Sequence, residues 1–458
     1  MKMECMKSFD LGVVPGWVCS ANVRLKGRDA MLFLYSEGPA TDPGEELLRF
    51  EGLKPVHLAV FEMDGRRLWD RELPSGVLPG PWFVPVIPLD MDEDGQDEIY
   101  FVNNTGAPFS FKHRKLERAD ALTGETTGTW KWPDYTFRER LSHCYRFYLI
   151  GGYVHGKPIL VTSQGTYGNM YLQGRGADMS PIWEKVILET EPGPRASHVT
   201  PVLDINGDGV DELLWGERAL SLEDGREVLN YAPEYNGHSD GLIPFRDYET
   251  GDWYVYTCRE GDENPGVKRI VTFRGNGGVA WWEFEGQGHM HEAWLANVHG
   301  PHRKISMTLR NTNFTMTENG VEYLHDGIFY HDAFTGERIE FPMPCEGTEM
   351  LPQDFDGDGY HEFYVFQGPL SGAILNDSGE EVGRIPSDAH CLRGGRILDR
   401  PGEQIMVKRE GSSRIEIYGD SEAEDGEVMR YRYSVPYLTF MQKMTASGYN
   451  ALHFSCAI

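Results

Sequence analysis

Three short stretches of the sequence concentrate carboxylate and amide oxygens at matching positions. The clearest is Leu203 to Trp215, LDINGDGVDELLW, and the pattern begins again at Asp90 and at Asp354. Glycines between the acidic residues permit a tight loop, and hard cations such as calcium prefer about six to eight oxygen ligands. The spacing predicts a structural Ca²⁺ in each loop, with these candidate ligands: Asp90, Asp92, Asp94 and Asp97; Asp204, Asn206, Asp208 and Asp211; Asp354, Asp356, Asp358 and Glu362.

Histidines form a second set that could do chemistry. Several of them stand just before, or at the start of, an apolar stretch: His143, His198, His238, His289, His291 and His390, with Trp82 in the same place in an earlier stretch. Other polar residues follow the next apolar stretch: Asn103, Asn104, Tyr167, Arg259 and Arg310. A single histidine of this kind is usually a hydrogen-bonded structural residue, but a repeated position favours a functional ring.

A repeated unit must position these residues. Each acidic loop runs into an apolar stretch typical of a strand, as in ELLW after Asp211. A second signature follows, with an Asp-Gly or Thr-Gly turn between alternating stretches, as at Gly65, Gly124, Gly225 and Gly336. Counting weaker copies gives eight units at roughly the 40–60 residues typical of propeller blades.

The fold class predicted from this repeat is all-β. We expect a single β-propeller domain over residues 1–458, built from eight four-stranded blades with calcium-type loops in some of them. Seven blades is the alternative, because the first and last units could share one blade. No linker, low-complexity segment or sustained helical periodicity interrupts the pattern.

Strand direction then predicts where chemistry takes place. Strands alternate within a blade, so the acidic loops and the Asp-Gly turns lie on one face and all other connections lie on the opposite face. The histidine set belongs to that opposite face. We therefore expect calcium to be structural, and the channel mouth lined by histidines to be the active face.

Histidine, tyrosine and arginine together suit proton abstraction next to an acid group. Arginine, with asparagine or histidine, would neutralise a uronate carboxylate, and histidine or tyrosine would exchange protons with C5 and with the departing glycosidic oxygen. A hydrolase would need two carboxylates facing the sugar, and this face offers only Asp240, Glu260 and Glu292. A transition metal held by histidines is another alternative, and His289 and His291 have the most suitable spacing.

Charge and cysteine content restrict the partners and the compartment. The formal net charge of −28 argues against nucleic acid and anionic membranes as partners. The 7 cysteines include no CxxC pair, which is typical of a reducing compartment. No apolar leader is evident near Met1, so we expect a cytoplasmic protein, or a secreted one if a leader has been removed from the sequence.

The runs SHVTPVLDINGDGVDELLWG, GHSDGL and GHMHEAWL resemble successive blades of propeller-type polysaccharide lyases, namely rhamnogalacturonan lyases and ulvan lyases. The tail PGEQIMVKREGSSRIEIYGD is similar to them too. The resemblance implies β-elimination at a uronic acid. It implies a catalytic role for Tyr167, with His143, His198 or His238 as proton-transfer partners.

The predicted active face carries a set of candidate substrate-binding residues: Trp82, Asn104, Arg195, Arg259, His289, His291 and Arg310. Arg195, Arg259 and Arg310 are the candidates for neutralising the carboxylate. The chain departs from ulvan lyases in the second blade, where it has Trp82, Asn103 and Asn104 in place of histidines.

Three functions follow as hypotheses. The first is a lyase that cleaves an anionic, uronate-containing oligo- or polysaccharide, with a rhamnose-rich glycan as a candidate. The second is a rhamnosidase-like glycoside hydrolase on similar glycans, since some relatives of this propeller group are described as rhamnosidases. The third is a non-catalytic carbohydrate-binding propeller.

Overall fold

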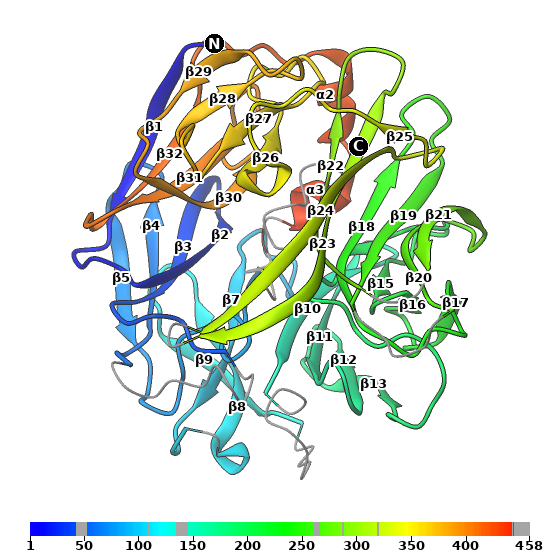
Figure 1. Ribbon diagram of the computed structural model, residues 1–458. Helices are drawn as coiled ribbons and strands as arrows, with labels where there is room; N and C mark the ends of the chain where they lie inside the picture. Colours follow the sequence, from blue (N-terminus) through cyan, green and yellow to red (C-terminus); the bar gives the residue numbers. More distant parts are fainter. Residues whose placement is uncertain are drawn as a thin grey trace.

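Eight four-stranded antiparallel sheets surround a central axis in the computed structural model (Figure 1). The structure describes residues 1–42, 53–108, 110–133, 145–260, 266–285, 288–317, 320–441 and 443. The predicted eight-bladed, all-β propeller is confirmed. A single domain over residues 1–458 stays a prediction. Among the described residues, no helix is long and apolar enough to span a membrane.

The blades follow one another in chain order. Blades 1 to 4 are β2–β5 (Trp17–Leu25, Arg28–Ser36, His57–Glu62, Arg67–Glu72), β6–β9 (Val86–Leu89, Glu98–Asn104, Arg114–Asp120, Thr126–Lys131), β10–β13 (Phe147–Val154, Lys157–Gln164, Met170–Arg175, Pro181–Ile187) and β14–β17 (Val202–Leu203, Glu212–Leu214, Arg218–Ser221, Glu227–Asn230). Blades 5 to 7 are β18–β21 (Ser239–Arg246, Trp253–Arg259, Lys268–Arg274, Val279–Glu285), β22–β25 (His289–Asn297, Lys304–Thr317, Gly320–Asp332, Arg338–Ile339) and β26–β29 (Met350–Gln353, Glu362–Val365, Ala373–Leu375, Glu381–Arg384). Blade 8 combines β30 (Ala389–Gly395), β31 (Gln404–Arg409) and β32 (Arg414–Asp420) with β1 (Met3–Asp10).

The two ends of the chain close the ring together. β1 forms the outer strand of blade 8 and pairs antiparallel with β32 from Met3↔Asp420 to Asp10↔Arg414. The first and last parts of the sequence therefore do share a blade, and the ring nevertheless contains eight sheets. Inner strands are buried along almost their whole length, as in β18, whereas outer strands such as β21 are half exposed.

The acidic loops have one repeated internal structure. In each loop the first aspartate, Asp90, Asp204 or Asp354, accepts N–H bonds from the loop backbone that follows it. The glutamate at the end of each loop accepts the N–H of the residue after that aspartate, as Glu362 does from Phe355 at 2.9 Å. The loop sequence therefore specifies a compact turn through its own side chains.

The residue before that glutamate links neighbouring blades. Asp97 accepts the backbone N–H of Arg24 at 2.7 Å, and Asp211 accepts that of Tyr153 at 2.7 Å. His361 takes the same place in blade 7, where its Nδ1 accepts the N–H of Asn297. Each acceptor reaches the first strand of the preceding blade, so part of the acidic pattern serves the packing of blades against each other.

Tryptophans of the outer strands make a second link between blades. The indole N–H of Trp183 donates to the carbonyl of Leu222 at 2.8 Å, and Trp69 and Trp281 donate in the same way to Ala121 and Ala333. Gly225 lies under the Trp183 ring at φ +70°, and a Cβ there would approach the ring to 2.7 Å. The Asp-Gly turn therefore needs glycine both for its backbone and for this close contact.

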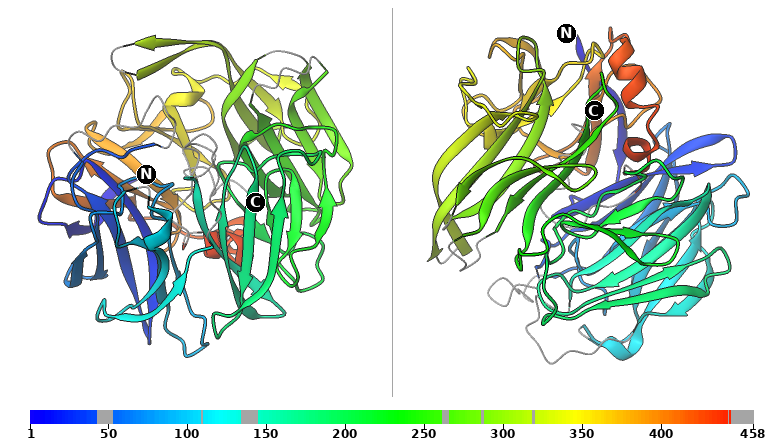
Figure 2. Two further views of the ribbon diagram at one scale, coloured as in Figure 1. Left: turned by 90° about the horizontal axis from the view of Figure 1, so that it is seen from below. Right: turned by 90° about the vertical axis from the view of Figure 1, so that its right-hand side faces the viewer.

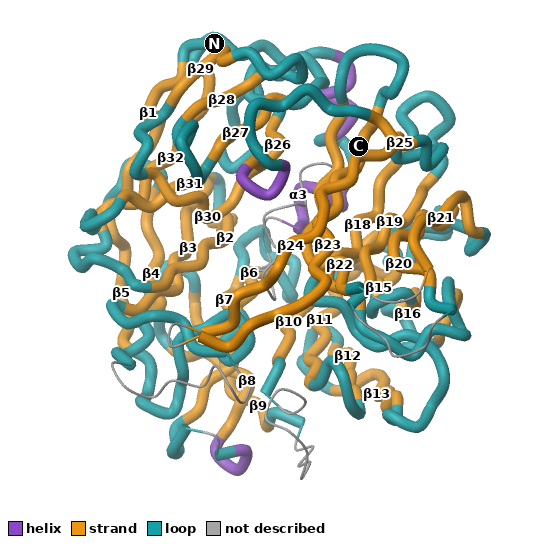
Figure 3. The backbone as a smooth tube through the Cα atoms, in the orientation of Figure 1, coloured by secondary structure: helices purple, strands orange, loops and turns teal. Residues whose placement is uncertain are grey.

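The two faces of the ring carry different additions. The short helices α2 (Glu427–Arg432) and α3 (Pro436–Met441) lie on the face of the acidic loops, and the long β23–β24 hairpin projects from the opposite face (Figure 2). Two single turns of 3₁₀ helix, η1 (Phe111–His113) and η2 (Gly347–Glu349), complete the described helices. Strands dominate the rest of the described chain (Figure 3).

Candidate functional site

A buried carboxylate, Asp240, lies at the centre of four of the predicted histidines. Asp240 Oδ2 is 2.5 Å from His289 Nε2 and 3.0 Å from His291 Nδ1. Asp240 Oδ1 is 3.8 Å from His198 Nδ1 and 3.6 Å from His238 Nε2. The predicted convergence of these four histidines is what the structure shows.

Strand ends explain why these residues meet. His198 precedes β14, His238 precedes β18, and His289 and His291 start β22, so all four stand where first strands enter blades 4, 5 and 6. A register shift between Met290 and Glu292 marks the start of β22. His289 and His291, two residues apart, consequently both reach the same oxygen of Asp240.

Burial divides the cluster into a floor and a rim. Asp240 is 1% exposed, and His198 and His238, which form the floor with it, are each 3% exposed. The side chains of His289 and His291 are 23% and 21% exposed. A ligand approaching from this face would therefore meet His289 and His291 before it met the carboxylate beneath them.

The pKa shifts follow from this geometry. Burial lowers the pKa of His238 to about 3, and burial together with the neighbouring His238 holds the pKa of His198 well below its usual range. Burial acts against charge on His289 and Asp240 too, but their mutual attraction and hydrogen bond raise the pKa of His289 and lower that of Asp240. Burial thus favours neutral imidazoles in the floor, and the ion pair with Asp240 favours the charged form of His289 at the rim.

Tyr167 lies beside this cluster, as the sequence predicted. Its hydroxyl is 3.4 Å from His198 Nε2, and its ring centroid is 4.6 Å from that of His238. The guanidinium of Arg146 lies 5.2 Å from the Tyr167 ring centroid and 4.3 Å from that of Trp82. Trp82 in turn packs edge-on against His198. The side chain of Tyr167 is partly exposed, so it can reach a ligand.

Arg146 and Asp42 are neighbours of the site that sequence reasoning missed. Asp42 accepts the indole N–H of Trp82 at 3.0 Å and lies 3.7 Å from the guanidinium of Arg146. Arg146 stands directly before β10, at the position that repeats in the histidine set. Its position before the strand could have identified Arg146 from the sequence, whereas Asp42 follows no repeated pattern.

The cluster has a donor set that fits a divalent metal ion. Ligand atoms of His198, His238 and Asp240 lie within 4.8 Å of one another, and so do those of Asp240, His289 and His291. Both ring nitrogens of His238 are buried and make no hydrogen bond to the described residues. Neutral imidazole with carboxylate is a ligand set that zinc and similar ions accept.

Three of the predicted substrate-binding residues have structural partners. Arg195 donates to the backbone carbonyls of Leu188, Glu191 and Gly193. The buried Arg259 forms an ion pair with Glu217 at 2.5 Å. The amide of Asn104 donates to the carbonyls of Gly76 and Ala107. These contacts fix loops around the site, and none of them joins the Asp240 cluster.

The remaining predicted residues have different surroundings. The guanidinium of Arg310 packs over the Phe284 ring at 4.8 Å, on the strand next to the one that carries His289 and His291. His143 lies outside the described residues.

The predicted calcium loops are on the opposite face, as expected from the topology. Ligand atoms of Asp90, Asp92 and Asp94 lie within 4.8 Å of one another, and so do those of Asp354, Asp356 and Asp358. Asp97 and Asp211 point instead to neighbouring blades. Burial raises the pKa of Glu212 to about 8 and that of Glu362 to about 9.

Helices α2 and α3 and the residues after them bring two cations to these loops. Arg432 is fully buried, donates to Asp354 at 2.8 Å and lies 3.7 Å from Glu403. Lys443 Nζ lies 2.5 Å from Asp97. Internal cations therefore supply part of the charge balance of blades 2 and 7.

The chain matches no known family model. It is 22% identical over 411 residues to the rhamnogalacturonan endolyase YesW of Bacillus subtilis (strain 168), a match that covers 79% of this chain and 61% of the relative. In fold it is similar to a rhamnogalacturonan lyase PL11 of Bacillus licheniformis, with a TM-score of 0.70, 17% identity and coverage of 99% and 82% of the two chains.

The exotype rhamnogalacturonan lyase YesX gives a TM-score of 0.71 at 16% identity, over 99% of this chain and 83% of that one. The TM-scores of 0.70 and 0.71 show a shared fold, and at identities of 16–17% the structural likeness shows the fold alone. The chain is therefore similar in sequence and in fold to rhamnogalacturonan lyases, as its blade motifs indicated.

Proposed function

We propose that the protein is a lyase that cleaves an anionic, uronate-containing oligo- or polysaccharide by β-elimination. The observation that carries the proposal is the group formed by Tyr167, His198 and His238 with the Asp240–His289–His291 triad beside it. The similarity to rhamnogalacturonan lyases supports the same class of reaction and favours a rhamnose-bearing glycan.

The first requirement of β-elimination is a base at C5 of the uronate. Tyr167 is partly exposed, and its hydroxyl adjoins the neutral His198. The nearby guanidinium of Arg146 favours negative charge on the phenolic oxygen. As Tyr167 takes the C5 proton, its own phenolic proton passes to His198 Nε2, the C4–C5 double bond forms, and the bond from C4 to the glycosidic oxygen breaks.

The second requirement is positive charge at the uronate carboxylate and a proton for the leaving oxygen. The pairing with Asp240 raises the pKa of the partly exposed His289 and so favours positive charge on it. His289 would bind the carboxylate as negative charge spreads onto it from C5. His291 contacts the same Asp240 oxygen, with its Nδ1 3.4 Å from His289 Nε2, and would donate the proton to the departing sugar.

A divalent cation held by His198, His238 and Asp240 would supply further positive charge beside the carboxylate. The residues themselves position the sugar and exchange its protons. Metal analysis of the purified protein and of His238→Ala tests this arrangement, because the variant should hold one metal equivalent fewer.

A hydrolase is less consistent with the geometry. Asp240 is 1% exposed beneath two histidines, so it cannot stand opposite Glu260 across a glycosidic bond. Burial raises the pKa of Glu260 to about 7, which suits a proton donor, but a hydrolase needs a second carboxylate that faces the same bond.

The nature of the product tests the proposal. Rhamnogalacturonan, ulvan and gum-type oligosaccharides are each incubated with the protein, and ultraviolet absorbance and reducing ends are followed together. A 4,5-unsaturated uronate that increases with the reducing ends supports the lyase. New reducing ends without that chromophore would replace it with a hydrolase, and saturable binding without any product would indicate a carbohydrate-binding propeller.

A further inference from the structure

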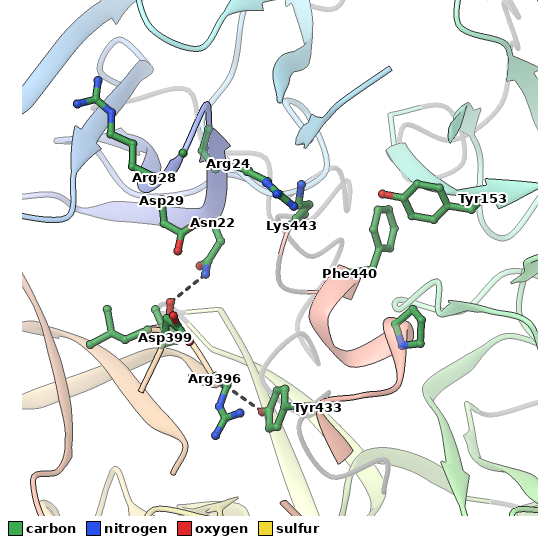
Figure 4. A pocket seen from close by; sticks show the side chains of 15 residues that line it. Asn22, Arg24, Arg28, Asp29, Tyr153, Arg396, Asp399, Tyr433, Phe440 and Lys443 are labelled. Atoms are coloured by element: carbon green, nitrogen blue, oxygen red, sulfur yellow. Dashed lines mark hydrogen bonds between the residues drawn. The ribbon is translucent and has the colours of Figure 1, made fainter. Parts of the chain in front are cut away.

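A cavity of about 720 Å³ lies on the face of the acidic loops, away from the histidine cluster. It is bordered by the β2–β3 turn of blade 1, by the segment that leaves β30 in blade 8, and by helix α3 with Tyr433 and Lys443 (Figure 4). The contacts that form the proposed active site do not include any of its lining residues.

One end of the cavity is basic. The ammonium of Lys443 and the backbone N–H of Arg24 both bind the carboxylate of Asp97, which brings Arg24 and Lys443 close together (Figure 4). The guanidinium of Arg24 is exposed and has no ion-pair partner among the residues that the structure describes. In a chain with a net charge of −28, this end offers a local site for a carboxylate.

The other end offers acceptors for hydroxyl groups. Asp29 and Asp399 line it together with Asn22, whose amide donates to the carbonyl of Ile397 at 2.9 Å (Figure 4). This bond holds the β2–β3 turn against the segment that carries Asp399. Carboxylate oxygens accept hydrogen bonds from the hydroxyl groups of a polyhydroxylated ligand.

Aromatic side chains complete the wall. Tyr153 and Phe440 pack edge to face with centroids 5.7 Å apart, and Tyr433 borders the same space. Tyr433 is held by two hydrogen bonds, one from the N–H of Arg396 and one to Glu403. The wall is therefore rigid and amphipathic, which suits the faces of sugar rings.

From this arrangement we infer a second carbohydrate site, which takes a short acidic oligosaccharide with its uronate carboxylate at Arg24 and its neutral sugar at Asp29 and Asp399. The inference deepens the proposed function, since it rests on the same class of glycan. The site would hold a chain end or a product while the histidine face acts on another part of the glycan.

Titration calorimetry of the Tyr167→Phe protein with a saturated galacturonate–rhamnose oligosaccharide tests the inference without turnover. Two sites per chain are expected. When Arg24→Gln is combined with Tyr167→Phe, the affinity of one site falls by at least about tenfold, which is about 1.4 kcal/mol, and the affinity of the other site is unchanged. Arg226→Gln, an exposed arginine on a turn of the same face, serves as the matched control and leaves both sites unchanged.

Other outcomes would overturn the inference. They are one site per chain, equal affinity in the Arg24→Gln background, and equally tight binding of a neutral oligosaccharide. Asp399→Asn gives a second test, because it should weaken the same site as Arg24→Gln and no other. The proposed function is read separately from the unsaturated product of the wild-type protein, so either claim can fail while the other holds.

Discussion

The buried guanidinium of Arg432 offers the sharpest test of how the C-terminal helices stabilise the ring. Its side chain is 0% exposed, as are those of its two carboxylate partners, Asp354 at 2.8 Å and Glu403 at 3.7 Å. Arg432→Met keeps an unbranched side chain of similar length but leaves two buried carboxylates without their cation. Breaking a buried ion pair from one side costs about 3–5 kcal/mol, a large part of the about 5–15 kcal/mol typical of folded proteins.

Chemical denaturation in a calcium-free buffer measures this loss. Arg430→Met is the control, because Arg430 lies on the same helix with an exposed side chain. Calcium should restore part of the stability of Arg432→Met, since an ion near Asp354 replaces the missing charge, by about 2.7 kcal/mol at a hundredfold excess over its Kd. A variant within about 1 kcal/mol of the wild type would refute the assignment of Arg432 as the cation that balances this loop.

Three further predictions follow from other contacts. Chelation of calcium should lower the free energy of unfolding of the wild type, and Asp208→Asn should reduce that response because it removes one oxygen from the blade 4 loop; an unchanged denaturation midpoint would contradict the calcium assignment. Arg146→Met should lower the rate of the proposed elimination by at least about tenfold with the fold retained, because a cation beside Tyr167 is lost; equal rates would exclude this role. Burial acts to raise the pKa of Glu117, but hydrogen bonds from Thr126, Asn103 and Arg71 lower it overall. Glu117→Gln should therefore lower the free energy of unfolding at neutral pH, and this difference from the wild type should disappear as the pH falls below about 4.3, the pKa of glutamate in the unfolded chain. A loss of stability that does not depend on pH would show that charge is not its cause.

Much of the fold could be predicted from spacing alone. An acidic loop such as Asp204 to Glu212 is specified by bonds between its own side chains and backbone, so its sequence records its shape. The Asp-Gly turn at Gly225 is equally local. The offset between His198 and the acidic loop then identified the face of the cluster, because a strand places its two ends on opposite faces.

Partners brought together by the ring could not be predicted in the same way. Asp240 was recognisable only as a possible hydrolase carboxylate, because its role as the centre of four histidines depends on three blades meeting. Arg259 was expected to face a substrate, but its partner Glu217 comes from a different blade. Nothing local in the sequence records such a pairing.

The direction of side chains within a loop was also beyond the pattern. Asp97 and Asp211 carry oxygens at the spacing expected of calcium ligands, yet both turn toward the first strand of the preceding blade. The short helices α2 and α3 gave no clear periodic signal, and so the cations Arg432 and Lys443 were not expected at the acidic loops.

The initial rate of appearance of unsaturated uronate, measured for Tyr167→Phe against Tyr254→Phe, tests the proposed active face most directly. Both variants lose one hydroxyl and keep the ring, and Tyr254 packs against Phe245 and Phe334, away from the Asp240 cluster. We predict that Tyr167→Phe forms the product at least about a hundredfold more slowly, as expected for loss of a proton-transfer group, while Tyr254→Phe remains near the wild-type rate. A Tyr167→Phe protein that forms unsaturated uronate at the wild-type rate would contradict the proposed mechanism.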